Sequence, residues 1–430
     1  MNEILVMEEV SKIASFNGIN VYNIKTDKFK TNTVHIFFCD DLSYENVTKN
    51  ALVPAVLRRG SQNHPSFRDL SQYLEQLYGA SFDCGVSKKG ERQIIQFYIE
   101  YVSEKYTGKD DRLSEKALDL LEEIITQPLF ENGLFKKSYV DQEKENLRRR
   151  IESRINDKVR YAVDRCLEEL CKGEPYELHE YGLIDQLENI TEEDLQKQYK
   201  YIIETLPVFV FISGDNDKEA LEKIVNRLKQ IPRGNIKELS DTVVSDKPVQ
   251  KIREVTEKMN ITQGKLSMGF KTNTATFEDD YYALAVYNGI LGGGIHSKLF
   301  QNVREKASLA YYSFSRLDKF KGLMVISSGV EIENKQKAID IIKEQLQEIK
   351  KGNITDYEFN STLKAYETGV KSMADSHIRI VDFYFSQALF GTDDTLETLI
   401  KKINRVTRDE VINVAKKIEP GVVYFLTSMD

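Results

Sequence analysis

The pattern of hydrophobic and polar positions in the first half of this chain is repeated in the second half. Residues 117–153 carry apolar side chains at helical spacing, then a short Asn/Gly turn, then a second and more charged helical stretch. Residues 338–374 repeat the same order, length and apolar spacing. The pattern therefore predicts a pair of consecutive helices in each half of the chain.

Two further pairs of segments support the repeat. Residues 189–215 and 405–430 each contain a Thr with an acid three residues later, an amphipathic stretch, a Pro and an apolar run typical of a strand. The Thr and acid pairs are Thr191 with Asp194 and Thr407 with Glu410. The runs 93–102 and 322–332 are also strand-like. The copies lie a little over 200 residues apart, a spacing typical of duplicated domains rather than of solenoid units.

These repeats predict an α+β fold of two homologous domains, each a mainly antiparallel sheet with helices packed on one face. A chain of 430 residues is also longer than one hydrophobic core usually serves. The polar, Gly- and Pro-containing stretch after residue 231 indicates the boundary. We expect an N-terminal domain over residues 1–235, a linker over 236–250 and a C-terminal domain over 251–430.

Charge and composition narrow the classes of partner and compartment. With 68 acidic and 60 basic residues the net charge is -8, which favours neither nucleic acid nor an anionic membrane as partner. The amino terminus lacks a basic leader, and no stretch reaches 18 apolar residues. The four cysteines form no CxxC pair, which favours reduced, mostly buried thiols in a cytoplasmic protein. They are Cys39, Cys84, Cys166 and Cys171.

The stretch "GGGIHSK", which contains Gly292, Gly293 and Gly294, is the most conspicuous candidate site. It lacks the Gly-Lys-Ser/Thr order of a phosphate-binding loop and the last glycine of a dinucleotide fingerprint. Two interpretations stay open: a turn before a helix that begins near Ser297, or a turn over which a peptide backbone passes.

Residue patterns alone predict no metal site and no catalytic nucleophile. None of the five histidines lies four residues from another, so no helix presents two imidazoles to one zinc ion. No G-x-S-x-G sequence occurs, and no cysteine has an activating partner nearby in the sequence.

The stretch "LGGGIHSKLFQNVREKASLAYY" resembles the carboxy-terminal half-motif of the insulinase or pitrilysin family of zinc metallopeptidases. The segments "SFNGINVYNIKTDKFKTNTVHIFF", "RDLSQYLEQLYGASFD" and "ITEEDLQKQYKYI" are also similar to that family, so the resemblance covers nearly the whole chain. It implies two similar α+β domains, with a catalytic zinc bound in the first by an inverted His-x-x-Glu-His motif and a distant second Glu.

In this chain the resemblance places that motif on "NALVPAVLRRGSQ", where its His, Glu and His positions are Ala51, Pro54 and Ala55. The second-glutamate position falls at about Arg150, with Glu143 and Glu145 out of register, and the segment 103–116 looks longer than the family's. We therefore expect a chain that binds no zinc and cleaves no peptide alone, with zinc held by a partner subunit.

The second domain keeps more of the family pattern. An Arg and a Tyr seven residues apart, implied to contact the substrate peptide and its oxyanion, match Arg304 and Tyr311, with Ser308 where a glycine is usual. The alternative is structural: Arg304 caps its own helix or forms a salt bridge at its C-terminus, and Tyr311 is half-buried in a sheet.

The resemblance thus favours a non-catalytic subunit of a heterodimeric insulinase-like metallopeptidase. Its partners would be a zinc-motif-bearing subunit and a peptide substrate, bound through Arg304, Tyr311 and the three glycines. The alternatives are a peptide- or protein-binding maturation or regulatory factor, of the bacteriocin-processing or elongation factor P modification type, a structural core-like subunit, or an enzyme with an unrecognised metal site.

Overall fold

The computed structural model of this chain describes residues 8–107, 112–241, 244 and 251–429. It divides into two compact units, each containing a segment from the other half of the chain. Unit 1 comprises residues 1–152, 178–240 and 375–385, and unit 2 comprises residues 153–177, 241–374 and 386–430. Most of the linker expected over 236–250 lies outside the described residues.

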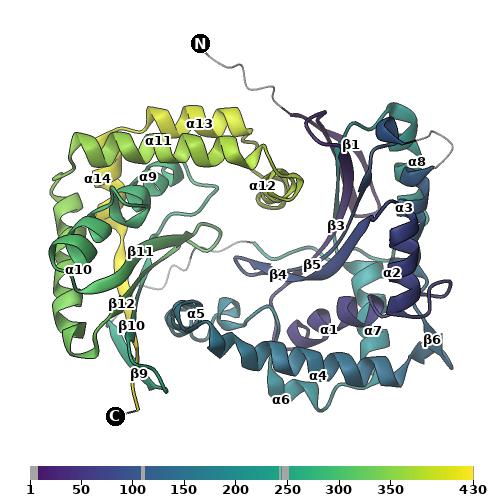
Figure 1. The fold of residues 1–430 in the computed structure, drawn as a ribbon, viewed down its shortest axis with the longest axis horizontal. Coiled ribbons are helices and arrows are strands. Elements are labelled where there is room, and N and C mark those ends of the chain that lie inside the picture. The colour runs from purple at the N-terminus through teal and green to yellow at the C-terminus, as the bar shows by residue number, and fades with distance from the viewer. Residues whose placement is uncertain (1–7, 108–111, 242–243, 245–250, 430) are drawn as a thin grey trace. The chain divides into compact units, whose positions relative to one another are not determined.

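Unit 1 is built on a six-stranded sheet (Figure 1). In spatial order its strands are β1 (Glu9–Phe16), β2 (Ile19–Lys25), β8 (Val208–Gly214), β3 (Thr31–Asp41), β5 (Arg92–Val102) and β4 (Ser81–Lys89). Its helices are α1 (Val47–Leu57), α2 (Phe67–Gln76), α3 (Leu113–Thr126), α4 (Lys137–Ser153), α6 (Ile184–Leu187), α7 (Glu192–Thr205) and α8 (Lys218–Leu228). A short hairpin, β6 (Phe130–Glu131) with β7 (Leu134–Phe135), precedes α4.

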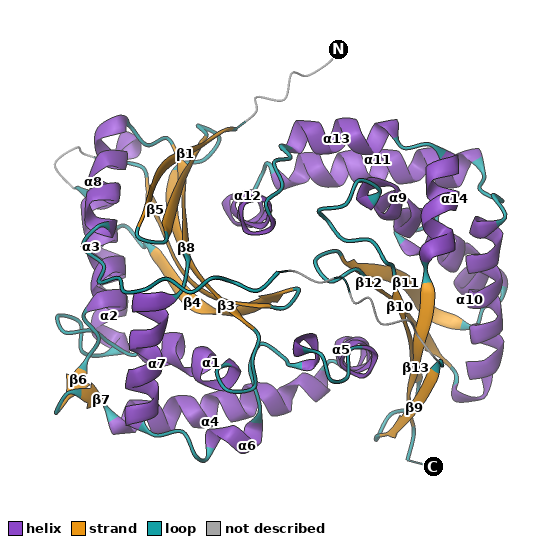
Figure 2. Ribbon diagram, turned by 180° about the vertical axis from the view of Figure 1, so that it is seen from behind, coloured by secondary structure: helices purple, strands orange, loops and turns teal. Residues whose placement is uncertain are grey.

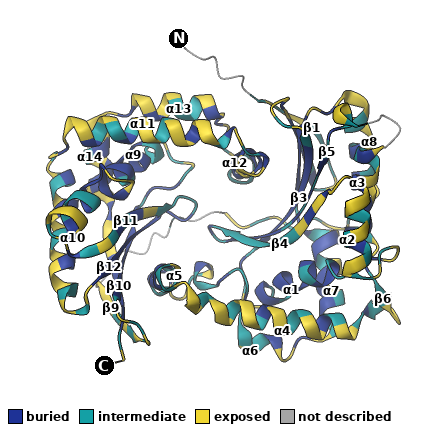
Figure 3. Ribbon diagram, viewed as in Figure 1, coloured by how far each residue is buried: buried dark blue, intermediate teal, exposed yellow. Residues whose placement is uncertain are grey.

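These helices share one hydrophobic core with one face of the sheet. Val34, Ile36 and Phe38 of β3 point into this core, as the two-residue period of a strand requires. The intervening Phe37 points to the opposite face, where its ring stacks 4.0 Å from Phe385 of α12 (His377–Phe390). The middle of the sheet is therefore covered on both faces, and Figure 3 shows the inner strands β3 and β5 as mostly buried.

Unit 2 is built on a five-stranded sheet (Figure 2). In spatial order its strands are β11 (Ala310–Asp318), β12 (Leu323–Val330), β10 (Gly264–Lys271), β13 (Glu419–Thr427) and β9 (Arg253–Lys258). Its core helices are α9 (Tyr281–Gly292), α10 (Lys335–Lys350), α11 (Asp356–Met373), α13 (Leu396–Arg405) and α14 (Arg408–Lys417). A π-helical segment, η5 (Phe300–Lys306), lies between α9 and β11.

One face of this second sheet packs on those helices and the other on α5 (Lys158–Leu170). Cys166 and Leu170 of α5 share a core with Val325 of β12 and Tyr424 of β13. Short 3-10 turns complete the two units: Glu104–Tyr106, Arg154–Asn156, Pro175–Glu177 and Ile332–Asn334.

The two sheets share one strand topology. The order β2, β8, β3, β5, β4 in unit 1 corresponds to β9, β13, β10, β12, β11 in unit 2, and in both the first two strands are parallel and the others antiparallel. The capping boxes predicted at Thr191 and Thr407 are present at the helices that precede β8 and β13. The predicted α+β fold of two homologous domains is confirmed, with one additional helix on the second face of each sheet.

The compact units differ from a simple division at residues 236–250. The chain crosses between them at Ser240, but residues 153–177 group with unit 2 and residues 375–385 with unit 1. The physical reason is the burial of apolar sheet surface. Helix α5 covers the face of the unit 2 sheet that the other helices of unit 2 leave open, and α12 does the same for the sheet of unit 1.

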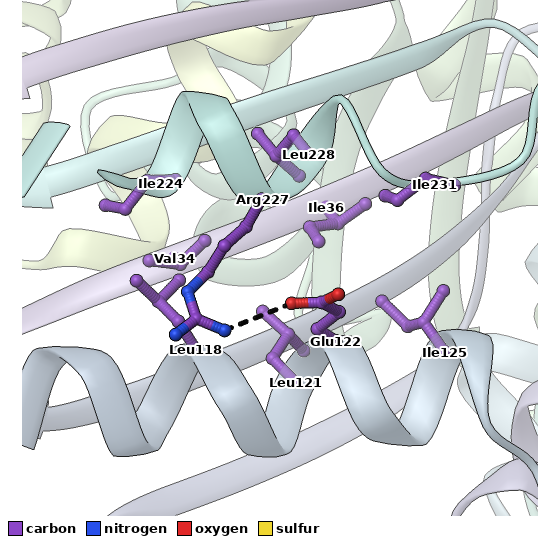
Figure 4. A pocket seen from close by; sticks show the side chains of 10 residues that line it. All are labelled: Val34, Ile36, Leu118, Leu121, Glu122, Ile125, Ile224, Arg227, Leu228 and Ile231. Atoms are coloured by element: carbon purple, nitrogen blue, oxygen red, sulfur yellow. Dashed lines mark hydrogen bonds and ion pairs between the residues drawn. The ribbon is translucent and has the colours of Figure 1, made fainter. Parts of the chain in front are cut away.

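A small apolar cavity of about 20 Å³ remains inside unit 1, between α3, α8 and β3 (Figure 4). Arg227 on α8 and Glu122 on α3 form an ion pair of 3.3 Å beside it. The space holds about one water molecule, so it is a packing gap and no ligand site. None of the described helices combines the length and apolarity needed to cross a bilayer.

Candidate functional site

The positions that correspond to the zinc motif lie on one face of α1. Ala51, Pro54 and Ala55 are spaced i, i+3 and i+4, the spacing that would bring three ligands together. Ala51 and Pro54 are buried in the unit 1 core, and Ala55 is half-buried. None of the three side chains has an atom that can bind a metal or move a proton.

The groups around α1 do not replace the missing ligands. The Cys84 thiol donates to the Pro54 carbonyl oxygen at 3.1 Å, and burial raises the pKa of this thiol to about 12, so it stays protonated. Glu143 on α4 is ion-paired with Arg59. The Arg150 guanidinium lies 5.4 Å from the centre of the Tyr181 ring.

Glu145, the other acid near the expected second-glutamate position, pairs with Arg149 at 2.8 Å. Within the described residues there is no group of three His, Cys, Asp or Glu side chains that could hold a metal ion. The residues present therefore do not fit the zinc that the first domain would carry in an active peptidase.

The glycines after α9 are explained in part by contacts within the chain. A Cβ on Gly292 would lie 2.2 Å from the Ser315 backbone nitrogen on β11, and a Cβ on Gly293 would lie 2.7 Å from Gly289 Cα. Gly292 is buried, whereas Gly293 and Gly294 are exposed. Close packing of α9 against β11 thus requires Gly292, and close approach to Gly289 requires Gly293. Gly294 has no such contact.

The segment after the glycines is held to α11 by buried polar contacts. His296 Nε2 lies 3.0 Å from Thr362 Oγ1, and Lys298 Nζ lies 2.9 Å from Glu358 Oε1. The Ser297 hydroxyl oxygen accepts from the Phe300 N–H at 3.4 Å, which caps the helical turn at the predicted position. His296 is therefore a structural histidine.

Arg304 and Tyr311 both present polar groups to solvent. The Arg304 side chain is 44% exposed on η5, 3.7 Å from Glu305 and over the Phe300 ring at 4.6 Å. Tyr311 on β11 is 78% exposed. Tyr311 is thus not half-buried in the sheet. Arg304 does form the ion pair within its own helix that the structural alternative expects, while its side chain stays partly exposed.

Ser308 lies between these two residues in the left-handed region, at φ +51°. This conformation costs a residue with a Cβ roughly 1 kcal/mol relative to glycine. The left-handed conformation at position 308 is a physical reason for the glycine that is usual there in the family that the chain resembles.

We therefore expect Ser308→Gly to stabilise unit 2 by about 0.5 to 1 kcal/mol. Urea unfolding followed by circular dichroism measures the change, since the chain has no tryptophan. Ser361→Gly, inside α11, is the control and should destabilise by about 0.5 kcal/mol, because serine is itself a weaker helix former than alanine. A destabilising effect of Ser308→Gly would contradict the expectation.

Sequence patterns gave no indication of a buried pair in unit 1. Ser213 Oγ on β8 lies 2.9 Å from His377 Nδ1 on α12, and His377 Nε2 lies 3.1 Å from the Thr31 carbonyl oxygen. Since Nε2–H donates to that carbonyl, Nδ1 accepts from the serine hydroxyl. Both side chains are buried, so the pair fixes α12 to the sheet.

The four cysteines are free thiols, and all but the partly buried Cys84 are fully buried.

Two domains of one topology, the first without metal-binding side chains at the zinc-motif positions, are typical of an inactive homologue of a two-domain metallopeptidase. A family model described as Peptidase M16 inactive domain matches residues 189–366. The chain is 36% identical over 421 residues to the probable inactive metalloprotease YmfF of Bacillus subtilis. The aligned region covers 98% of each of the two chains. The chain belongs to the M16 peptidase family, which is the insulinase or pitrilysin family.

Solved structures show the same fold. A conserved protein from Enterococcus faecalis V583 matches with a TM-score of 0.89 and 31% identity over 98% of both chains. The crystal structure of a peptidase M16 inactive domain from Pseudomonas fluorescens matches with a TM-score of 0.80 and 18% identity over 98% of both chains.

Proposed function

We propose that this chain is the non-catalytic subunit of a two-chain M16 metallopeptidase in the cytoplasm. The observation that carries the proposal is an asymmetry between the domains. The first domain has no side chain that binds zinc at Ala51, Pro54 or Ala55, whereas the second presents Arg304 and Tyr311 to solvent. A subunit with intact zinc ligands would complete the enzyme.

The two exposed side chains suit recognition of a peptide. The Arg304 guanidinium offers forked N–H donors to a peptide carbonyl or carboxylate. The Tyr311 hydroxyl offers an O–H donor to the oxygen on which negative charge develops during hydrolysis. Gly293 and Gly294 are also exposed, and a turn without side chains can accept a peptide backbone.

The test is to purify the chain together with an M16 relative that bears the His-x-x-Glu-His motif and is encoded in the same genome. The rate at which the two chains together cleave a peptide library is then measured. We expect Tyr311→Phe to lower kcat about 100-fold, since loss of one oxyanion donor has this size of effect. Arg304→Ala should raise KM and lower kcat/KM by about tenfold, because it removes contacts with bound peptide.

Matched controls are Arg316→Ala, an exposed arginine on β11, and Tyr357→Phe, an exposed tyrosine on α11. Both should leave the kinetics unchanged. If all four variants are silent while the two chains stay associated, the chain is a scaffolding subunit. Equal cleavage by the partner alone, or stoichiometric zinc in the isolated chain, would also overturn the proposal.

A further inference from the structure

Unit 2 contains a second candidate site, an apolar pocket of about 210 Å³ between α10 and strands β10 and β13. Met268 and Phe270 of β10 and Leu346 of α10 line it. A cavity of about 150 Å³ is large enough for benzene, so this one accommodates an apolar body of about six to eight carbons.

Two lysines of α10 line the same pocket. Lys343 and Lys350 are seven residues apart, so they lie two turns apart on one face of the helix with Leu346 between them. Neither forms an ion pair with a residue that the structure describes. The nearby Glu348 carboxylate is instead held by Lys351 at 3.2 Å and by the Asn353 amide.

The described charged residues that line this pocket, Lys343 and Lys350, are both positive. No acidic side chain is among the described residues that line it. At the inner side, Tyr287 is fully buried and its hydroxyl has no hydrogen-bond partner. The positive charge of Lys350 is stabilised by the helix dipole at the carboxyl end of α10. Lys343 lies near the middle of the helix, where the dipole does not stabilise a positive charge.

We infer that this pocket binds a small amphipathic carboxylate, with its apolar body between α10 and the sheet and its carboxylate beside Lys343 and Lys350. Ammonium groups that no described acidic residue pairs with, beside an apolar cavity, complement an anionic head on an apolar tail. The site is independent of Arg304, Tyr311 and any partner subunit.

Isothermal titration of the full chain with octanoate tests the inference. We expect one site per chain, with a Kd of about 0.1 to 1 mM for a ligand of this size. The double variant Lys343→Glu with Lys350→Glu should weaken binding at least tenfold. Lys337→Glu, an exposed lysine of α10 that does not line the pocket, should change it less than twofold.

Leu346→Phe, which fills the pocket, should also weaken octanoate binding at least tenfold. If Leu346→Phe does not fold, the result for the double variant Lys343→Glu with Lys350→Glu decides. The inference is overturned if octanol or octylamine binds as tightly as octanoate, if octanoate shows no binding at 10 mM, or if the double variant binds normally. Self-association that Leu346→Phe abolishes would assign the pocket to a second copy of the chain and also overturn it.

Discussion

Glu174→Ala is expected to lower the free energy of unfolding by about 3 to 5 kcal/mol, because it removes a carboxylate shared by two buried lysines. Glu174 Oε2 lies 2.8 Å from Lys321 Nζ, and Glu174 Oε1 lies 3.8 Å from Lys271 Nζ. The lysine side chains are only 2% and 8% exposed. The substitution leaves two ammonium groups buried in unit 2 without this counter-charge.

Urea unfolding followed by circular dichroism at neutral pH measures the effect. Glu367→Ala is the control, since Glu367 forms an exposed ion pair with Lys371 on α11 and should cost less than about 0.5 kcal/mol. The loss of unfolding free energy for Glu174→Gln should lie between those for Glu174→Ala and Glu367→Ala, because glutamine keeps a hydrogen-bond acceptor but carries no charge. A loss below about 1 kcal/mol for Glu174→Ala would show that the lysines are stabilised by their other contacts.

The same residues explain why the sequence could not assign segment 153–177 to a unit. The helical spacing of apolar residues in α5 predicts an amphipathic helix but carries no information on which sheet it covers. The assignment depends on contacts with distant parts of the chain, such as Cys166 with Tyr424 and Glu174 with Lys321. Long-range contacts of this kind leave no local pattern.

Local features were predictable because their physics is local. The capping boxes at Thr191 and Thr407 join residues three apart, and the strands β5 and β12 follow from runs of β-branched and aromatic residues. The π-helical turn at Phe300–Lys306 was not predictable from spacing, since its sequence fits an ordinary α-helix equally well.

For the candidate site, the resemblance predicts which zinc ligands are missing more directly than which residues contact a peptide. Alanine and proline side chains have no donor atoms in any environment, so the expected loss at Ala51, Pro54 and Ala55 depends only on residue type. The exposure of Tyr311 and the burial of Gly292 depend on how β11 packs, which spacing alone does not determine. The pocket beside Lys343 combines segments far apart in the chain and gave no sequence pattern at all.

The stability of the folded chain is expected to fall as the pH decreases from 6.5. Burial, with the nearby His377, lowers the pKa of His35 to about 3, and burial lowers the pKa of His377 as well. Unfolded histidines bind a proton below about pH 6.5, whereas folded His35 stays neutral down to about pH 3. The unfolded state therefore binds more protons in this range, and the stabilisation present above pH 6.5 is lost progressively below it.

Between pH 6.5 and 5 we expect His35 alone to cost about 2 kcal/mol, measured by urea unfolding at half-unit intervals. His35→Phe keeps a ring between Phe37 and Tyr98 but cannot titrate, so its free energy of unfolding should depend less steeply on pH. Phe209→Leu on β8 is the matched control, because it weakens packing against Phe385 equally at every pH and its ring does not stack on His35. If His35→Phe unfolds with the same pH dependence as the unmodified chain, groups other than His35 cause the loss.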